Sequence, residues 1–307
     1  MKKGKYLITG CAGFIGSHLV SRLHKKYNLT LVDDFSEGSK KNLPIKLRNQ
    51  IIKKKIQDIN STQFKKLNGI IHLAAQSSVP YSMKNFFNSS ANNILSSLKI
   101  FEMAKKYSIP IVYASSSAIY GNLPKGYDIK EKFSISSPYA QDKMTLENYA
   151  RMMFDVFNIS SVGLRFFNVY GPRQNANSPY AAVIPIFIDK MKKNLPVTIN
   201  GGHQTRDFIF VDDVVEIIAL SMKRAQSKKV CDVFNVGTGR SINIDYLFKI
   251  IKQRIPNKSK IIKKSLDKFD PKKSSGNFNK LKKYILNKNF TFTKLEEGID
   301  KILNNKI

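Results

Sequence analysis

Apolar and polar positions follow two alternating patterns along the first two-thirds of this 307-residue chain. Short continuous apolar runs, typical of buried parallel strands, alternate with segments whose apolar residues recur at helical spacing. The runs that we interpret as strands cover 6–9, 29–32, 69–75, 109–114, 161–167 and 233–236. The helical patterns cover 14–23, 89–106, 138–157 and 211–223. This alternation predicts an α/β fold built on a Rossmann-type, doubly wound parallel sheet.

The alternation stops twice, at residues 172–205 and again after residue 239, where shorter elements rich in Pro, Asn and Lys follow. We therefore expect residues 1–171 and 206–239 to form the sheet domain. Residues 172–205 and 240–307 are expected to form a smaller, discontinuous domain. Ligands bind at the carboxyl ends of the strands in such sheets, so this smaller domain should pack there and bind a substrate.

The link between the first strand and the first helix carries three glycines at GxxGxxG spacing, Gly10, Gly13 and Gly16. Glycines let the backbone approach a pyrophosphate, and a helix N-terminus presents unpaired N–H groups to it. The second strand ends at Asp33, whose carboxylate can hydrogen-bond ribose hydroxyls and would repel a 2′-phosphate. Because strand, turn, helix, strand and acid follow in this order, the sequence predicts a dinucleotide site for NAD.

The chain is strongly basic, with 52 Lys and Arg against 22 Asp and Glu and a formal net charge of +30. Nucleic-acid-binding proteins can have such a charge. Here the lysines form small scattered groups without a basic arm or an RNP-type aromatic motif. We interpret them as a solvated surface that could attract an anionic substrate, and we expect no nucleic-acid partner.

The remaining composition is that of a soluble globular protein. It is 42% hydrophobic, and no apolar run approaches the roughly 18 residues that a membrane span needs. The two cysteines and four histidines show no metal-ligand spacing, so we expect no metal site. A reduced cytoplasmic location and no membrane partner fit these features.

A serine-rich strand end and a Tyr–Lys pair supply candidate chemistry. Ser115, Ser116 and Ser117 close an apolar run, and Tyr139 and Lys143 stand four residues apart at a predicted helix start, on one helix face. An ammonium near a phenol lowers the phenol's pKa from about 10 towards neutrality, which makes the phenolate a usable base. Pairs at this spacing also arise by chance, so the hypothesis depends on the serine strand and the glycine loop.

Several segments together resemble the extended short-chain dehydrogenase/reductase family, and within it the nucleotide-sugar epimerases. They are GCAGFIGSHL, IIHLAAQSSVP, YASSSAIYG, YAQDK, LRFFNVYGPRQ, TRDFIFVDDVV and FNVGTG. The resemblance covers residues 4 to about 245. It implies an NAD-dependent enzyme that epimerises C4 of a UDP-sugar through a transient 4-keto form. UDP-GlcNAc/UDP-GalNAc is the favoured substrate pair and UDP-Glc/UDP-Gal the second. It also implies a homodimer formed through the helices that begin near Ser89 and Pro138.

The resemblance carries roles to individual residues. Tyr139 would be the base, Lys143 would tune it, and Ser117 would bridge it to the sugar. The cofactor would be bound by Gly10, Gly13, Phe14, Ile15, Asp33, Asp58, Ile59, Leu73, Ala74, Ala75, Ser115, Tyr139, Lys143 and Phe167. The sugar nucleotide would be bound by Ser117, Tyr139, Asn168, Val183, Asn200, Arg206 and Ser274.

Two other functions compete with this interpretation. Sugar 4,6-dehydratases of the family carry an Asp-Glu or Ser-Glu pair just after the strand, two residues before the Tyr-Gly, where this chain has Ser117 and Ala118. An alanine cannot shuttle a proton, so dehydration is disfavoured. A catalytically silent, basic Rossmann protein that binds nucleic acid is the second alternative. In the tail, Ser274 falls where the family has a residue that gates sugar size. Asp267 falls where it usually has an arginine for the diphosphate, a role that Lys264 or Lys268 could take over.

Overall fold

The computed structural model describes residues 3–129, 132–178, 181–266 and 270–304. Its main layer is a parallel sheet of seven strands in the order β10-β6-β5-β4-β1-β2-β3. Along the chain, these strands are β1 (Lys5–Thr9), β2 (Asn28–Val32), β3 (Ile51–Ile52), β4 (Gly69–His72), β5 (Ile111–Ser116), β6 (Ser161–Phe166) and β10 (Cys231–Val236). The predicted α/β fold with a doubly wound parallel sheet is confirmed.

The direction of winding reverses beside β1, which pairs with β2 on one side and with β4 on the other. Successive connections from β1 therefore leave towards opposite edges of the sheet, and a crevice opens at the carboxyl ends of β1 and β4. The loop after β1 carries the glycines, and β4 ends at His72, so that Leu73 to Ala75 leave the sheet at this crevice. The predicted strand over 69–75 is thus shorter because its end forms part of a cavity wall.

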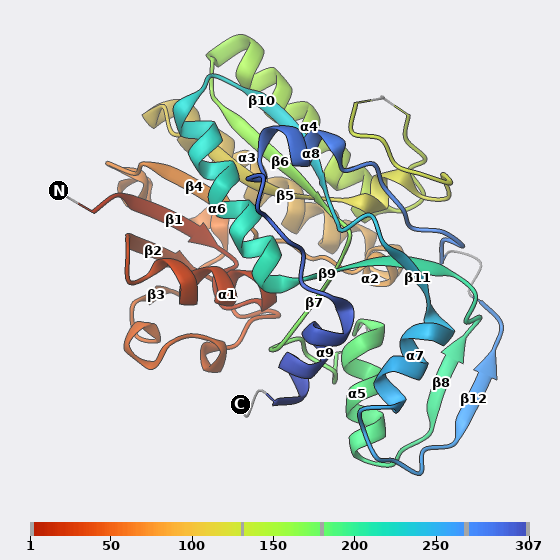
Figure 1. Cartoon of the computed structure of the whole chain (residues 1–307). Coiled ribbons are helices and arrows are strands. Elements are labelled where there is room, and N and C mark those ends of the chain that lie inside the picture. The colour runs from red at the N-terminus through yellow and green to blue at the C-terminus, as the bar shows by residue number, and fades with distance from the viewer. Residues whose placement is uncertain (1–2, 130–131, 179–180, 267–269, 305–307) are drawn as a thin grey trace.

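Helices cover both faces of the sheet (Figure 1). α1 (Phe14–Leu23) and α6 (Val211–Ser227) share one apolar core with the sheet, and α3 (Phe86–Tyr107) and α4 (Pro138–Phe157) share another. The short helix α2 (Val79–Lys84) directly precedes α3. Burial of an apolar stripe from each helix against the apolar strands stabilises this three-layer arrangement.

A smaller lobe follows the carboxyl ends of the strands (Figure 1). It contains a sheet of β11, β9 and β7, a parallel pair of β8 and β12, and a separate apolar core. Its elements are β7 (Asn168–Tyr170), α5 (Val183–Lys192), β8 (Val197–Asn200), β9 (Thr205–Phe210), β11 (Ser241–Asn243), α7 (Ile244–Lys252), β12 (Ile261–Lys264) and α9 (Leu295–Asn304). Between β12 and α9 the chain returns to the large layer, where α8 (Asn279–Tyr284) buries Leu281 against the main core.

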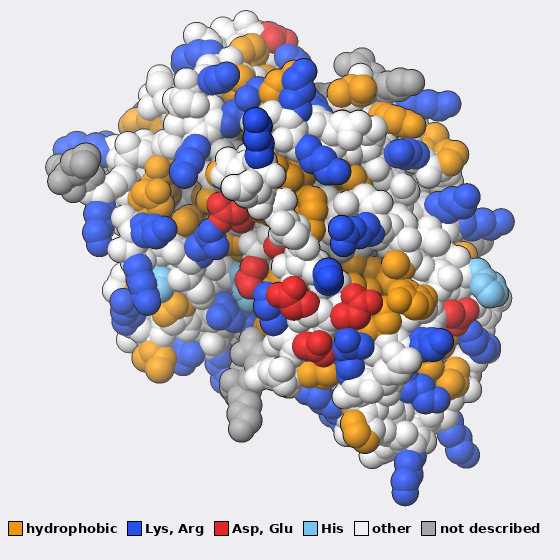
Figure 2. All heavy atoms as spheres, viewed as in Figure 1, with side chains coloured by type: hydrophobic (Ala, Val, Ile, Leu, Met, Phe, Trp, Pro, Cys, Tyr) orange, Lys and Arg blue, Asp and Glu red, His pale blue; other side chains and the backbone are white. Residues whose placement is uncertain are grey.

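The surface matches the scattered pattern of basic residues in the sequence. On the face shown in Figure 2, Lys and Arg side chains are spread over both lobes and are not gathered in one patch. Within the described ranges, no helix is both long and apolar enough to cross a membrane.

Candidate active site

The loop between β1 and α1 has a backbone path that requires glycine. Gly10 has φ +67°, and a Cβ on Gly16 would lie only 2.0 Å from the carbonyl oxygen of Gly10. Gly13 is the N-cap of α1 and offers no side chain to the free N–H groups of the first turn. These N–H groups therefore remain available to an anion, and the positive end of the helix dipole favours one.

Asp33 stands at the end of β2 beside this loop, and its carboxylate is buried. It accepts hydrogen bonds from the backbone N–H groups of Ala12 (2.8 Å) and Phe35 (2.9 Å). Burial raises the pKa of the carboxyl, and the two backbone bonds oppose that rise. A carboxylate has about four lone-pair sites, so two acceptor positions remain for the hydroxyls of a ribose.

The glycine loop and Asp33 form one end of a continuous cavity of about 1480 Å³ that runs between the two lobes. Pockets for one small molecule commonly measure about 300–1000 Å³, so this cavity has room for a dinucleotide and a second ligand. Eighteen of the twenty residues expected to bind cofactor or substrate line it. They are Gly10, Gly13, Phe14, Ile15, Asp33, Leu73, Ala74, Ala75, Ser115, Ser117, Tyr139, Lys143, Phe167, Asn168, Val183, Asn200, Arg206 and Ser274.

Asp58 and Ile59, which the resemblance places beside the adenine, are not among the residues that line this cavity. Ile59 is 3% exposed and packs in the core under α3, and Asp58 ends a short 3-10 turn with its side chain towards solvent. Lys54, Lys55 and Ile56 line the cavity instead.

The start of α4 fixes the Tyr–Lys pair. Ser137 caps the helix by accepting the N–H of Ala140 at 3.2 Å, and Pro138 occupies the first turn. The N–H of Tyr139 itself donates to the buried hydroxyl of Ser82 at 3.2 Å. The backbone position of Tyr139 is therefore set by contacts with two different segments.

Lys143 reaches back from the next turn of α4 towards β5. Its Nζ donates to the carbonyl oxygen of Ala114 at 2.8 Å and lies 5.7 Å from the centroid of the Tyr139 ring. Burial lowers the pKa of Lys143 to about 8, although Asp142 and Glu147 oppose this shift. Burial also raises the pKa of Tyr139. The buried phenolate therefore depends on the neighbouring ammonium and on hydrogen bonds for its stability.

One of those hydrogen bonds comes from Ser116, and it lowers the pKa of Tyr139. Ser116 is the last residue of β5, while Ser117 begins the following 3-10 turn. The Ser116 oxygen also accepts the N–H of Ala118 at 3.1 Å, which holds the hydroxyl in place. The structure thus brings Ser116 to the phenol, whereas Ser117, the serine expected in that role, lines the cavity one residue later. The three serines are adjacent, so their spacing alone could not separate them.

The opposite end of the cavity belongs to the smaller lobe. Arg206 on β9 donates to the carbonyl oxygen of Thr205 at 2.7 Å and forms an ion pair with Asp270. The sequence analysis did not select Asp270, which carried no motif signal. Asn168 donates to the carbonyl oxygen of Asp207 at 3.2 Å. The backbone N–H of Ser274 donates to the carbonyl oxygen of Thr205 at 3.0 Å, and Ser274 lines this end of the cavity.

In the tail, the sequence offered Asp267, Lys264 and Lys268 as residues near the diphosphate. Asp267 and Lys268 lie outside the described residues. Lys264 is exposed on β12 and is not on the cavity wall. Within the described ranges, no group of three or more His, Cys, Asp or Glu residues could hold a metal ion.

The residues present fit NAD. The glycine cradle leaves no room for side chains where a pyrophosphate would approach, and the α1 N–H groups face the same space. Asp33 retains acceptor capacity for ribose hydroxyls, and its charge disfavours a 2′-phosphate. Ser115, Phe167, Tyr139 and Lys143 line the same cavity further from the glycine loop. A redox-active ring bound there would lie beside the candidate base.

Comparison with known proteins agrees with this geometry. Residues 6–237 match the model of the NAD dependent epimerase/dehydratase family. A UDP-glucose 4-epimerase of Mycolicibacterium smegmatis is 34% identical over 246 residues, which cover 76% of this chain and 77% of that protein. Among solved structures, a UDP-N-acetylglucosamine 4-epimerase from Methanobrevibacter ruminantium in complex with UDP-N-acetylmuramic acid is 35% identical with a TM-score of 0.90, covering 99% of this chain and 98% of its own. A UDP-glucose 4-epimerase from Thermotoga maritima with UDP-glucose is 33% identical with a TM-score of 0.86, covering 97% and 96%.

Proposed function

The chain belongs to the NAD dependent epimerase/dehydratase family, so it is an enzyme that uses NAD, and we propose that it epimerises C4 of a UDP-sugar. The observation that carries this proposal is the position of Tyr139, Lys143 and Ser116 in the same cavity as the glycine loop. A base beside the redox cofactor can deprotonate an alcohol while that alcohol is oxidised. The second half of the cavity has room for the nucleotide of the substrate.

In the proposed reaction, NAD supplies the oxidation and the matching reduction at C4 when it is bound. The Tyr139 phenolate accepts the proton of the 4-hydroxyl as the ring becomes a 4-keto sugar. The hydroxyl of Ser116 hydrogen-bonds the phenolate and can pass the proton between the sugar and Tyr139. The ammonium of Lys143 stabilises the phenolate by its charge. The 4-keto sugar then rotates so that its opposite face meets the cofactor. As C4 is reduced again, Tyr139 returns the proton to the oxygen on C4.

Arg206 is the proposed anchor for the diphosphate. Its guanidinium is largely buried, lines the cavity and is paired with the carboxylate of Asp270. A diphosphate can accept two parallel N–H bonds from guanidinium, so it can compete for this cation. Anchoring by the nucleotide leaves the sugar ring free to turn, which an epimerisation at C4 requires.

Epimerisation is favoured over dehydration because the residue before Ile119 is Ala118, which lines the cavity. Elimination of water needs an acid and a base close to C5 and C6, and a methyl side chain supplies neither. Ser117, the preceding residue, carries only an unactivated hydroxyl. This argument supports a product with the same mass as the substrate.

UDP-GlcNAc and UDP-GalNAc are the proposed substrate pair, with UDP-Glc and UDP-Gal second. Ser274 supports this preference because its small side chain stands on the cavity wall and leaves space for an N-acetyl group. Val183 and Asn200, which also belong to the smaller lobe, line the same cavity. The solved relative that acts on UDP-N-acetylglucosamine also has the same fold over nearly the whole chain.

We further propose a homodimer formed through α3 and α4. These adjacent helices expose large apolar side chains, among them Phe87 at 81%, Leu95 at 49% and Val156 at 64% exposed. Apolar groups concentrated on one pair of helices are typical of a protein–protein contact. A second copy of the same helices would cover them as a four-helix bundle.

The function is tested by incubating the purified protein with UDP-GlcNAc or UDP-Glc and separating the products by capillary electrophoresis with mass detection. An epimer keeps the mass of the substrate, whereas a dehydrated product loses one water. The variant Tyr139→Phe should retain bound NAD and lose turnover. Turnover by this variant at the wild-type rate would exclude Tyr139 as the base.

A further inference from the structure

One face of α4 contacts the end of β5 at three successive levels. Tyr139, Lys143 and Glu147 are spaced four residues apart, so they lie along the same side of the helix. The first two contact Ser116 and the carbonyl oxygen of Ala114, as described above. At the third level Ser115 donates its hydroxyl to Oε1 of Glu147 at 2.5 Å. Three consecutive residues of β5 thus each contact one residue of this helix face.

Glu147 is held firmly in this position. It is 7% exposed, and the guanidinium of Arg165 on β6 binds it with both sides of its fork. The Nε–Oε1 distance is 2.9 Å and the Nη2–Oε2 distance is 2.6 Å. Bidentate pairs of this kind restrict orientation as well as adding energy. These bonds hold the carboxylate oriented towards Ser115.

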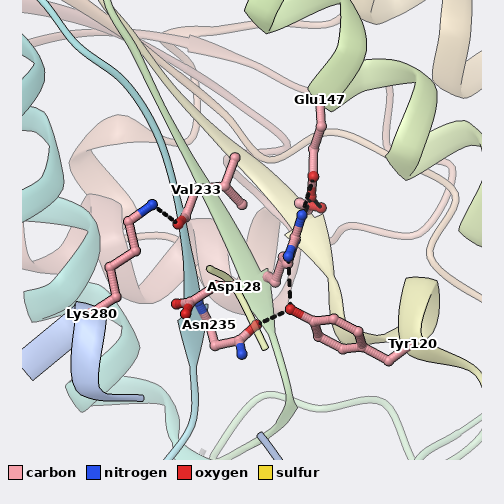
Figure 3. A network of polar contacts seen from close by, with 8 residues as sticks. Tyr120, Asp128, Glu147, Val233, Asn235 and Lys280 are labelled. Atoms are coloured by element: carbon pink, nitrogen blue, oxygen red, sulfur yellow. Dashed lines mark hydrogen bonds and ion pairs between the residues drawn. The ribbon is translucent and has the colours of Figure 1, made fainter. Parts of the chain in front are cut away.

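The contacts continue from Arg165 across the main sheet to Asn235 on β10 (Figure 3). Arg165 Nη1 donates to the Tyr120 hydroxyl at 2.7 Å, and that hydroxyl donates to Oδ1 of Asn235 at 2.7 Å. The amide of Asn235 then donates to the carbonyl oxygens of Gly126 (3.2 Å) and Asn277 (3.0 Å). This chain of bonds joins the helix face to segments that border the ligand space.

We propose that Glu147 is a positioning residue that registers α4 on the serine end of β5 and maintains the charge of Lys143 beside Tyr139. Its kinetic consequence rests on the proposed function. The bonds from Ser115 and from both sides of the Arg165 fork hold the Glu147 carboxylate in place between β5 and β6.

The charged and titratable groups around Lys143 determine whether its pKa rises or falls when the charge of Glu147 is removed. On α4 these are Tyr139, Asp142 and Glu147, on β4 the imidazole of His72, and on β6 the Glu147-bound guanidinium of Arg165. Asp142 accepts a hydrogen bond from the amide of Asn93 at 3.0 Å. Burial and Lys143 lower the pKa of His72 to about 3, so this ring is neutral at working pH. Loss of the Glu147 charge therefore lowers the pKa of Lys143 further below about 8.

The variant Glu147→Gln tests the proposal because it keeps the shape and removes the charge. We expect the alkaline limb of the kcat/KM profile to move down by about one pH unit, the lower end of what one neighbouring charge causes. We also expect the ionisation midpoint of Tyr139 to rise, measured as the phenolate absorbance of each protein minus that of its Tyr139→Phe counterpart. Glu147→Asp keeps the charge and should restore the wild-type position of the alkaline limb.

A matched control comes from another ion pair of the main sheet, Arg224–Asp232, which lies away from the cavity with an Nε–Oδ2 distance of 2.8 Å. Asp232→Asn should reduce stability without moving either pH readout. If Glu147→Gln does not fold, the double variant E147Q/R165Q removes both charges and the penalty of an unpaired one. A smaller shift in the same downward direction is then expected, because the opposing charge of Arg165 is lost as well.

An unmoved alkaline limb together with an unmoved Tyr139 midpoint in the folded variants would overturn the role of Glu147. The phenolate titration needs no substrate. If the wild-type protein turned over no UDP-sugar, the proposed function would fail, and the titration would still decide the role of Glu147.

Discussion

Ser116 offers the sharpest test of the catalytic geometry, because its neighbour Ser117 provides a control of identical chemistry. Ser116 hydrogen-bonds the phenol of Tyr139, and Ser117 lines the same cavity one residue later. The perturbation is Ser116→Ala, compared with Ser117→Ala in an otherwise unchanged chain. Replacement of Ser116 removes one hydrogen bond to a group that is charged only in its active form.

The magnitude follows from the type of bond. A hydrogen bond to a charged group contributes about 1.5–3 kcal/mol. Since 1.36 kcal/mol is a factor of ten, Ser116→Ala should reduce kcat by roughly 10- to 150-fold. The same hydroxyl caps the 3-10 turn by accepting the N–H of Ala118, so stability should also fall by about 1 kcal/mol. Ser117→Ala loses neither contact and should remain within a few-fold of wild type.

The assay follows interconversion of UDP-sugar epimers over a range of pH, with urea unfolding as the measure of stability. Ser116→Ala should also move the acidic limb of the profile to higher pH, because the phenolate loses a hydrogen bond that lowers its pKa. Ser116→Thr keeps a hydroxyl and should recover most of the activity. If Ser117→Ala loses as much activity as expected for Ser116→Ala while Ser116→Ala keeps it, the structural assignment is wrong.

Four further variants test other parts of the argument. Gly16→Ala should weaken NAD binding measured by fluorescence titration, because overpacking at a Cβ position 2.0 Å from a carbonyl oxygen costs about 1–3 kcal/mol. Ser274→Tyr should reduce kcat/KM for UDP-GlcNAc about tenfold or more and spare UDP-Glc, whereas equal loss for both sugars would contradict the size gate. His72 has its pKa lowered from 6.5 to about 3, so the unfolded chain binds the extra proton between these values and stability falls as pH decreases. At pH 5 this amounts to about 2 kcal/mol, and His72→Asn should flatten the pH dependence of the urea midpoint. Phe87→Lys should shift the protein to monomer in light scattering, and an unchanged mass would exclude α3 from the dimer contact.

Local sequence patterns were sufficient to predict a feature when that feature is formed by one short segment of the chain. The glycine loop, the acid at the end of β2 and the Tyr–Lys face of α4 each depend on a few consecutive residues and their periodicity. Steric limits on backbone and helix geometry act within such segments, so spacing predicts them. The sheet with its reversal beside β1 follows from the same alternation.

Features that depend on tertiary packing could not be predicted from local sequence patterns. The burial of Ile59 in the core under α3 and the exposure of Asp58 depend on contacts with distant segments, which no local pattern indicates. The choice between Ser116 and Ser117 depends on where β5 ends and the 3-10 turn begins. Asp270 reaches Arg206 from 64 residues further along the chain, and no local pattern indicates that contact.

The sequence by itself determined the fold class through the alternation of its strands and helices. It also indicated the nucleotide loop and the candidate phenol and ammonium, because each of these depends on residues close together in the chain. Only the tertiary structure decided which serine meets the phenol, which acid pairs with Arg206, and how Glu147 and Arg165 support the helix. These contacts join β5, β6 and α4 across long stretches of chain. Their geometry is set by how apolar surfaces pack, and the order of residues in any one segment does not contain it.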